Sequence, residues 1–341
     1  MQLLALATAV PPQSWSQAEC WQSLSAAPAI RELKPRSIAM LEKVLLGSNG
    51  IDSRHFCTDR LEDVFDRNAQ GLSETYEREA RKLGNTALRD AMAQAESPTL
   101  DALFVCTCTG YLCPGLSSHI AEELDLPSHC FLSDNTGAGC GAAIPTLRAA
   151  SNYLAAHPTH RVGVVAVEVC SAAFYISDDP GVLISLCLFG DGAAAVVLGG
   201  EKEAGWQMDT FTTVHLPAER EKIRFVNREG KLCNQLHRAV PEIAARAVKD
   251  LYTQTGHGAP IITHTGGRDV LAAIRDQLPD HPLTESTEVL RTRGNMSSPS
   301  VLHALELALS QNGQTPDGLW LVSFGAGFSA HSCRLHRYPE S

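Results

Sequence analysis

The 341-residue sequence contains no apolar run that approaches the roughly 20 residues of a membrane-spanning helix. Lysine and arginine are scattered rather than clustered, and the formal net charge is −10, which argues against a nucleic-acid partner. Cysteine and histidine do not occur at zinc-ligand spacings, because Cys106 and Cys108 are too close together and no histidine cluster completes them. These absences predict a protein that spans no membrane, binds no nucleic acid and holds no metal.

A disulfide framework and a secretory signal are also missing. The 11 cysteines have irregular spacings, which indicates reduced thiols in a reducing compartment. The apolar start has no basic segment and soon meets Pro11 and Pro12, so it predicts a first β-strand rather than a signal peptide. We therefore expect a cytoplasmic protein.

The sequence is rich in apolar runs of strand length that alternate with helical patterns. Hydrophobic residues make up 44% of the chain, which is enough for a large core. The run 162–169 is apolar on both faces, as in a central strand covered by helices. A polar, glycine-rich stretch at 199–205 separates two parts with a similar order of elements. This rhythm predicts an α/β fold with an N-terminal half at 1–200 and a C-terminal half at 201–341.

Cys140 lies between glycines where a loop gives way to an apolar helix. Gly137, Gly139 and Gly141 allow a tight turn that leaves the sulfur uncrowded, and the helix directs free N–H groups and its positive dipole end at the thiol. Both effects favour the thiolate, so we interpret Cys140 as a candidate nucleophile. The alternative is a small buried hydrophobe in a glycine-rich turn.

Two polar residues follow later strand or helix patterns in a similar setting. His264 ends an apolar strand and precedes Gly266 and Gly267, and Asn295 follows Gly294 just before another helix. Strand ends followed by glycine are where α/β proteins place reactive groups. The alternatives are a strand-terminal histidine with a satisfied hydrogen bond, and an asparagine that caps the following helix.

In this order, Cys140, His264 and Asn295 resemble the active site of the thiolase superfamily. The sequence is most similar to the chalcone synthase-like, or type III, polyketide synthases through Phe-Gly-Asp-Gly-Ala-Ala-Ala, His-Thr-Gly-Gly, Gly-Asn-Met-Ser-Ser and Phe-Gly-Ala-Gly, and the likeness spans 7–327. It implies a thiolase-like αβαβα layered fold of two pseudo-repeated halves, the first with the cysteine and the second with the histidine and asparagine. It also implies a homodimer, with the end of segment 106–115 at the interface.

The resemblance implies a decarboxylating acyltransferase that forms carbon–carbon bonds. Cys140 would attack a starter thioester and hold the acyl group. Neutral His264 and the Asn295 amide would donate hydrogen bonds to the malonyl thioester carbonyl as carbon dioxide leaves and charge develops there. The enolate would attack the Cys140 thioester, and the extended chain would cyclise to a pyrone, a resorcinol or a similar product. Acyl-CoA and malonyl-CoA would be substrates, with no cofactor.

The resemblance also implies a substrate cavity with unusual lining. Phe189 matches a gatekeeping aromatic and Phe324 an aromatic of a glycine-rich scaffold, although both could equally be core residues. A second gatekeeping phenylalanine of the family falls near Asn234, which predicts a wider and more polar cavity mouth. Other expected lining positions carry Cys108, Cys113, Cys170, Ala173 and Ser297. The product is therefore not expected to be a chalcone.

Few basic residues remain where plant members of the family bind the phosphates of coenzyme A. The candidates are Lys43, Arg36, Arg54 and Arg268. An acyl carrier protein is an alternative donor, because a phosphopantetheine arm needs few charges. The sequence favours coenzyme A thioesters, since it shows no basic landing patch for an acidic carrier protein.

Three other functions fit part of the pattern. Ketoacyl-carrier-protein synthase III shares the three reactive residues and performs one condensation, but it usually has an asparagine shortly after the histidine, where this chain has Arg268 and Asp269. A papain-like hydrolase also uses cysteine, histidine and asparagine, although its local signatures are absent. A non-catalytic acyl-binding protein would not need all three groups.

Overall fold

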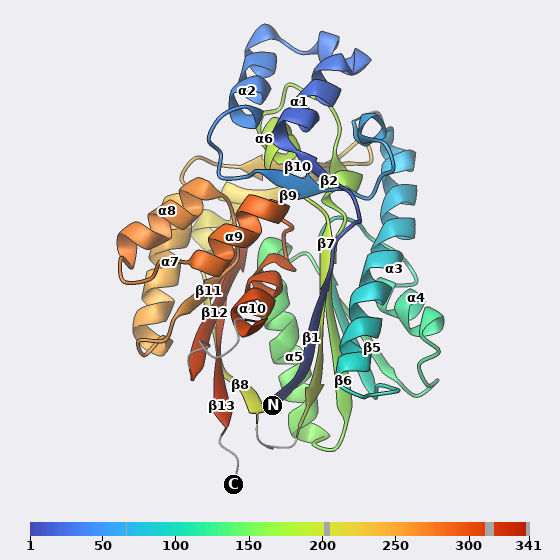
Figure 1. Ribbon diagram of the computed structural model, residues 1–341, viewed down its shortest axis with the longest axis vertical. Coiled ribbons are helices and arrows are strands. Elements are labelled where there is room, and N and C mark those ends of the chain that lie inside the picture. The colour runs from blue at the N-terminus through green and yellow to red at the C-terminus, as the bar shows by residue number, and fades with distance from the viewer. Residues whose placement is uncertain (66, 201–204, 311–316, 339–341) are drawn as a thin grey trace.

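The computed structural model describes residues 1–65, 67–200, 205–310 and 317–338 (Figure 1). The strands are β1 Gln2–Ala9, β2 Ser14–Ser16, β3 Ser53–His55, β4 Ala102–Thr107, β5 Phe131–Thr136, β6 Arg161–Glu168, β7 Gly192–Gly199, β8 Gly205–His215, β9 Ile223–Arg228, β10 Lys231–Leu236, β11 Ile261–Thr263, β12 Gly318–Gly325 and β13 Ser329–Tyr338. The helices are α1 Gln17–Ala26, α2 Pro35–Leu45, α3 Ala69–Gln94, α4 Leu116–Glu123, α5 Ala143–Ala156, α6 Pro180–Leu188, α7 Val240–Thr255, α8 Arg268–Gln277, α9 Thr284–Arg293 and α10 Ser300–Ser310.

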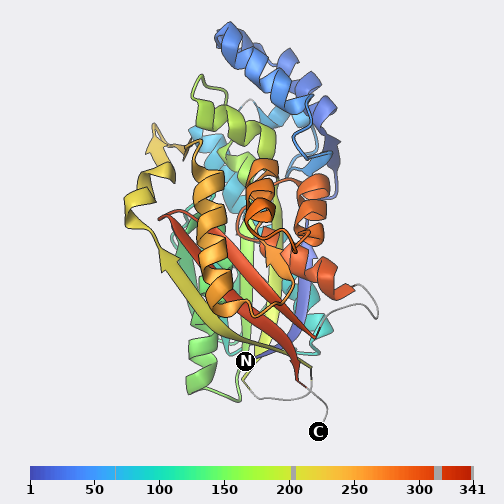
Figure 2. The same cartoon turned by 90° about the vertical axis from the view of Figure 1, so that its left-hand side faces the viewer.

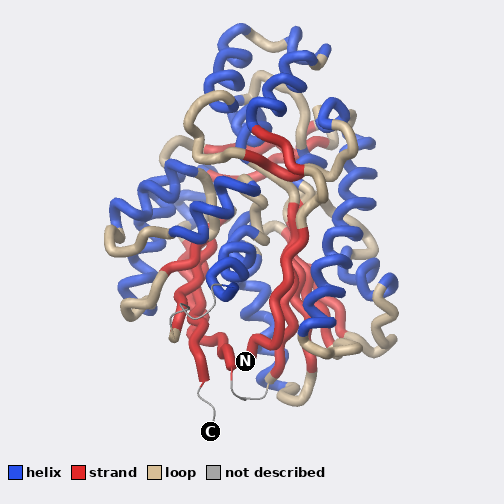
Figure 3. The backbone as a smooth tube through the Cα atoms, viewed as in Figure 1, coloured by secondary structure: helices blue, strands red, loops and turns tan. Residues whose placement is uncertain are grey.

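Nine strands form one sheet in the order β11-β12-β13-β8-β1-β7-β6-β4-β5. Strands β1 and β8 join the part built from the first 200 residues to the part built from later ones, with Leu3 opposite Trp206. The two groups of strands diverge from this junction, and helices α5 and α10 lie between them (Figure 3). The sheet therefore supplies both β-layers of the molecule.

Helices form the other three layers. The middle layer contacts both groups of strands, because α10 packs against β1, β7, β11 and β12 while α5 packs against β4, β6, β12 and β13. On one outer face α3 covers β1, β6 and β7, and on the other α7 covers β8 and β13. This α-β-α-β-α arrangement, visible in Figure 1, confirms the thiolase-like layered fold.

The central strands are buried on both faces, as their composition predicts. In β6, Val164 packs in the cluster that contains Leu147 of α5, whereas the next residue, Val165, packs in the cluster that contains Leu88 of α3. Alternate side chains of a strand point to opposite faces, so a run of valines serves both helical layers. The run 162–169 is therefore a central strand covered by helices on both faces, as its composition predicts.

A smaller unit covers one end of the layers (Figures 1 and 2). It contains α1, α2 and α6, whose apolar side chains share one cluster that includes Leu24, Leu41 and Leu186. Strands β9 and β10 form a separate two-stranded hairpin beside α6. Strands β2 and β3 form a second small ladder. The end of the molecule that these pieces cover holds the main cavity described below.

The α/β alternation expected from the sequence is confirmed, but α3, α9, β8 and β13 were among the elements not singled out. Residues 201–204 of the expected polar boundary lie outside the described residues, so the division at residue 200 stays a prediction. Within the described ranges, no helix is long and apolar enough to cross a membrane. Over the same ranges, no group of three or more His, Cys, Asp and Glu side chains is placed to hold a metal ion.

Two glycines in the first turns of helices provide a test of the packing of the hairpin. Gly181 of α6 lies against the hairpin, where an added Cβ would meet the backbone oxygen of Asn234 at 1.9 Å. An added Cβ on Gly71 of α3 would meet nothing closer than a side-chain atom at 3.4 Å. We expect Gly181→Ala to lower the free energy of unfolding by about 1–3 kcal/mol through overpacking. The matched Gly71→Ala should be neutral or stabilising by up to about 1 kcal/mol, because alanine favours helix.

Urea denaturation of both variants measures the difference. Equal effects of the two substitutions would show that the hairpin does not rest on Gly181.

Candidate active site

A cavity of about 960 Å³ opens between the smaller covering unit and the ends of the layered strands. Its lining includes Cys140, His264 and Asn295, which come from three separate turns. Phe189 and Phe324 line the same cavity. The structure therefore brings together the three candidate reactive residues and both aromatic residues expected beside them.

Cys140 lies in the short helical turn Gly139–Gly141 between β5 and α5. Gly139 has a φ of 60°, and a Cβ on Gly141 would meet the backbone of β12 at 3.2 Å, so both positions favour glycine. The Ser323 hydroxyl donates a hydrogen bond of 2.9 Å to the carbonyl of Gly141 and fastens the turn to β12. The glycines thus place Cys140 against the end of β12, a strand of the C-terminal half.

Burial opposes the Cys140 thiolate that the glycine turn and the following helix are expected to favour. The residue is 8% exposed, and burial raises the pKa of its thiol to about 12. The hydrogen bond from Ser297 opposes this rise but is the smaller effect. Desolvation of the charged form outweighs the stabilising influence of the turn and the helix that follows it.

Ser297 links several groups at the base of the cavity. Its Oγ lies 3.2 Å from the Cys140 sulfur, 3.2 Å from the Cys108 sulfur and 3.4 Å from Oε1 of Glu168. The residue has a φ of 59°, which is an uncommon conformation for serine and is found where surrounding contacts impose it. Cys108 and Cys140 therefore share one hydroxyl neighbour.

Glu168 is a buried carboxylate that the sequence interpretation did not assign to the site. Burial raises its pKa, although the hydrogen bonds that it accepts oppose the shift. Its donors are the Ser298 hydroxyl at 2.6 Å, the Cys108 N–H at 2.9 Å, and the Thr109 hydroxyl and N–H at 2.9 and 3.1 Å. The available signal was its place as the one acidic residue in the apolar run 162–169.

His264 lies at the end of β11 and is almost completely buried. Burial lowers the pKa of its imidazole to about 3, so the ring is neutral near neutral pH. The ring of Phe324 meets it edge to face, with 5.2 Å between the centroids. Its Nδ1 atom is buried without a hydrogen-bond partner in the described part of the chain.

Asn295 is held by both ends of its side-chain amide. Its Oδ1 accepts a 2.8 Å hydrogen bond from the N–H of Ser297, and its Nδ2 donates one of 2.8 Å to the carbonyl of Gly266. Helix α10 begins only at Ser300, so Asn295 closes a local turn and does not cap that helix. The second Nδ2 hydrogen remains available to a bound molecule.

A second cavity, of only about 20 Å³, adjoins the first. Phe189 and Asn234 line both cavities, and so does Phe225, which the sequence interpretation missed. Phe225 and Asn234 are direct partners across the β9–β10 ladder, so their side chains share one face of the hairpin. Cys108, Cys170, Ala173 and Ser297 also line the small cavity, and their expected place in a substrate cavity stays a prediction.

Two expected site residues lie elsewhere. Cys113 is exposed on the loop before Pro114 and lines neither cavity, so its expected place in the cavity of its own chain is wrong. Arg54 is 0% exposed and hydrogen-bonds to Gln17, Leu186 and Phe189, so it presents no surface to a phosphate. Its expected part in coenzyme A binding is also wrong, because strand β3 directs its side chain into the interior.

The other basic candidates lie around the large cavity. Arg36 and Lys43 of α2 and Arg268 at the start of α8 belong to its lining. Two further arginines of the hairpin region, Arg224 and Arg238, line it too and were missed. The cavity therefore carries more positive charge than α2 alone predicts.

Comparisons with known proteins agree with this geometry. A family model described as FAE1/Type III polyketide synthase-like protein matches residues 10–258. A 3,5-dihydroxyphenylacetyl-CoA synthase of Amycolatopsis orientalis is 32% identical over 262 residues, which cover 71% of this chain and 70% of that protein. A 1,3,6,8-tetrahydroxynaphthalene synthase of Streptomyces peucetius subsp. caesius is 30% identical over 364 residues, with 96% of this chain and 90% of that protein covered.

The fold comparison gives the same answer for the whole architecture. The crystal structure of PKS-I from the brown alga Ectocarpus siliculosus has a TM-score of 0.89 to this chain at 21% identity, and the match covers 99% of this chain and 98% of that one. The family match extends over most of the chain, including the Cys140 turn and the run that carries Glu168. The chain belongs to the FAE1/type III polyketide synthase-like family and is a decarboxylating, carbon–carbon condensing acyltransferase.

Proposed function

We propose that Cys140 carries the growing acyl chain, and that His264 and Asn295 stabilise the enolate formed when a malonyl thioester loses carbon dioxide. The observation that carries this proposal is the meeting of all three residues in one cavity of about 960 Å³. Such a volume is in the range of ligand sites that enclose most of a small molecule. The chain and the extender can therefore react inside it.

Loading transfers the acyl group between two sulfur atoms. The Cys140 sulfur forms a bond to the starter carbonyl carbon, the bond from that carbon to the coenzyme A sulfur breaks, and the Cys140 proton ends on the departing thiol. Because burial disfavours the Cys140 thiolate, the uncharged thioester suits this environment better than the charged resting form would. The loaded state is then stable enough to await the extender.

Decarboxylation uses neutral hydrogen-bond donors. Neutral His264 and the free Nδ2 hydrogen of Asn295 donate to the malonyl thioester oxygen as the carbon–carbon bond to the carboxylate breaks. The enolate carbon attacks the Cys140 thioester, and the cysteine sulfur is released as the new bond forms. The extended chain returns to Cys140 for the next round and finally cyclises to a pyrone, a resorcinol or a similar product.

Coenzyme A is the proposed carrier of both substrates, with no cofactor. Arg36, Lys43 and Arg268, joined by Arg224 and Arg238, line the cavity and offer cations to its phosphates. An acyl carrier protein remains the alternative donor, and its phosphopantetheine arm would use the same opening.

A homodimer in the cytoplasm completes the proposal. Strand β5 is an edge of the nine-stranded sheet, and an exposed edge is a template for pairing with a second chain. Phe131 of β5 is 50% exposed and Tyr111, in the loop that precedes α4, is 76% exposed. These apolar surfaces support a partner copy on this side, and the free cysteines support a reducing compartment.

Replacement of Cys140 tests the nucleophile. Wild-type protein incubated with an acyl-CoA should gain one acyl group by intact mass, and with malonyl-CoA it should form products of more than one extension. Cys140→Ala should lose the acyl adduct and all condensation, since it removes the sulfur that lines the large cavity with His264 and Asn295, whereas Cys108 lines only the small cavity. Cys333→Ala, which removes a buried thiol of β13 outside the cavity, should behave as wild type.

Acylation that persists in Cys140→Ala would defeat the assignment. A single β-ketoacyl product from the wild-type enzyme would instead support one condensation per cycle.

The neutral state of His264 predicts a pH-dependent stability. The unfolded side chain binds a proton below about pH 6.5, whereas the buried ring, with a pKa of about 3, does not. Acid therefore favours the unfolded chain. In a Cys140→Ala background, the free energy of unfolding relative to that of Cys140→Ala/His264→Gln should fall by about 2 kcal/mol between about pH 7.5 and pH 5.

Urea denaturation at the two pH values measures this difference. A constant difference would mean that the folded ring takes up its proton at the ordinary pH.

Phe225 predicts a limit on chain length. Its side chain lines both the large cavity and the small one, so Phe225→Ala should enlarge the space available to the chain on Cys140. We expect a shift toward products longer by at least one extension unit, measured by mass spectrometry of total products. Val226→Ala, on the other face of the same strand, is the matched control and should leave the product range unchanged. An unchanged range in Phe225→Ala would show that another surface stops the chain.

A further inference from the structure

Arg54 is a buried cation that contacts two segments beside the large cavity, the end of α6 at Phe189 and the Gly294–Asn295 turn. Its side chain is completely buried in the short strand β3 and lines neither cavity. Its three hydrogen bonds go to neutral acceptors: Nε donates to Oε1 of Gln17 at 2.9 Å, and Nη1 donates to the carbonyls of Leu186 and Phe189 at 2.8 Å each. The guanidinium also lies over the ring of Phe56, 4.9 Å from its centroid.

The two carbonyls belong to the end of α6. A helix leaves its last carbonyls without intrahelical partners and carries negative partial charge there, so Nη1 of Arg54 finds acceptors at this end. Its Nη2 is buried without a hydrogen-bond partner among the described residues. Phe189, which follows the last residue of α6, is also the aromatic residue that lines both cavities. Arg54 thus fixes the backbone of Phe189 through the hydrogen bond to its carbonyl.

The same helix end binds the Asn295 turn. The N–H of Asn295 donates to the carbonyl of Leu188 at 2.9 Å, and the N–H of Gly190 donates to the carbonyl of Asn295 at 3.0 Å. Arg54 and Asn295 therefore hold neighbouring carbonyls of one segment. The stem of Arg54 also packs on Gly294, where an added Cβ would meet its Cγ at 2.8 Å.

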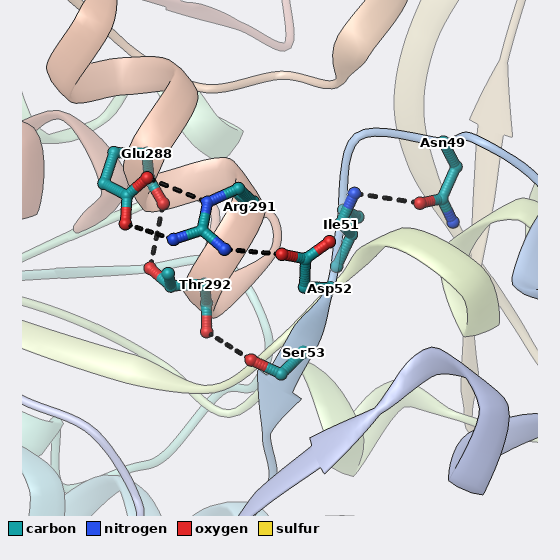
Figure 4. Close-up of polar contacts among 7 residues, drawn as sticks. All are labelled: Asn49, Ile51, Asp52, Ser53, Glu288, Arg291 and Thr292. Atoms are coloured by element: carbon teal, nitrogen blue, oxygen red, sulfur yellow. Dashed lines mark hydrogen bonds and ion pairs between the residues drawn. The ribbon is translucent and has the colours of Figure 1, made fainter.

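Strand β3 is fixed in turn by α9, so the guanidinium has little freedom to move. The N–H of Asp52 donates to the carbonyl of Arg291 at 2.7 Å, and the Ser53 hydroxyl donates to the carbonyl of Thr292 at 3.0 Å. The carboxylate of Asp52 also pairs with the guanidinium of Arg291 (Figure 4). These contacts lie just before the Gly294–Asn295 turn.

We propose that Arg54 is a positioning residue that sets the Asn295 amide relative to Phe189, and so controls decarboxylation of the extender. The inference rests on the proposed role of Asn295. It follows from one segment, 186–190, whose carbonyls and N–H groups are shared between the guanidinium and the asparagine backbone. Starter loading depends on the Cys140 turn, which Arg54 does not touch.

Arg54→Met tests this role, because methionine fills much of the space and removes all three hydrogen bonds. Two rates are compared: transfer of a starter acyl group to Cys140 without malonyl-CoA, and release of carbon dioxide from malonyl-CoA in a Cys140→Ala background. We expect the second rate to fall by about 100-fold, the effect of a small displacement of a reacting group, and the first to change by less than about threefold. Arg54→Lys should recover part of the loss, since an ammonium reaches fewer of the acceptors.

Arg67→Met is the control for the loss of a partly buried guanidinium outside these contacts, and it should leave the ratio of the two rates unchanged. Equal losses of both rates in Arg54→Met, or no loss of decarboxylation, would overturn the proposal. If Arg54→Met does not fold, the same comparison is made with Arg54→Lys, where a selective loss of decarboxylation is still required. Asn295→Ala separates the two hypotheses: if it decarboxylates normally, the proposed role of Asn295 has failed rather than that of Arg54.

Discussion

Burial of the reacting groups is the constraint on which the rest of the site depends. Cys140 and His264 reach the cavity from opposite halves of the sheet, and each is uncharged because its charged form would lose hydration on burial. Glu168 is buried with them and needs several donors from neighbouring loops. The glycine turns, the strained Ser297 and the packing of α5 and α10 are all arrangements that bring these polar groups together in the interior.

The sequence predicted the parts of the site that have local signatures. Cys140, His264 and Asn295 each lie in a glycine-containing turn with a recognisable local motif. The structure was needed for residues whose partners are distant in the chain. Phe225 acts with Asn234 only because they face each other across a hairpin, and Arg54 lies near basic residues in sequence while its strand turns it inward. Strand β8 alternates buried and exposed positions irregularly, and β13 is buried over most of its length although many of its residues are polar, so their sequence patterns were weak.

Opposite halves of the molecule are joined most closely through backbone groups. The Gly139–Gly141 turn rests on β12, where the backbone atoms approach to contact distance, and the Phe189–Gly190 segment forms a bridge with Asn295. Such contacts are insensitive to the identity of most side chains, yet they allow no added atom at the glycines. A common architecture at low sequence identity is therefore understandable, because the positions that must be kept are few and mostly small.

The β9–β10 hairpin has a consequence for how this enzyme can change. It forms its own two-stranded sheet, separate from the nine-stranded sheet, yet it supplies Phe225 and Asn234 to the lining of both cavities. Substitutions there alter the space beside the acyl chain without entering the layers that hold Cys140, His264 and Asn295. Their energetic effects should be largely independent of those in the scaffold. Substitutions confined to the hairpin can therefore change the range of products while the chemistry of condensation is retained.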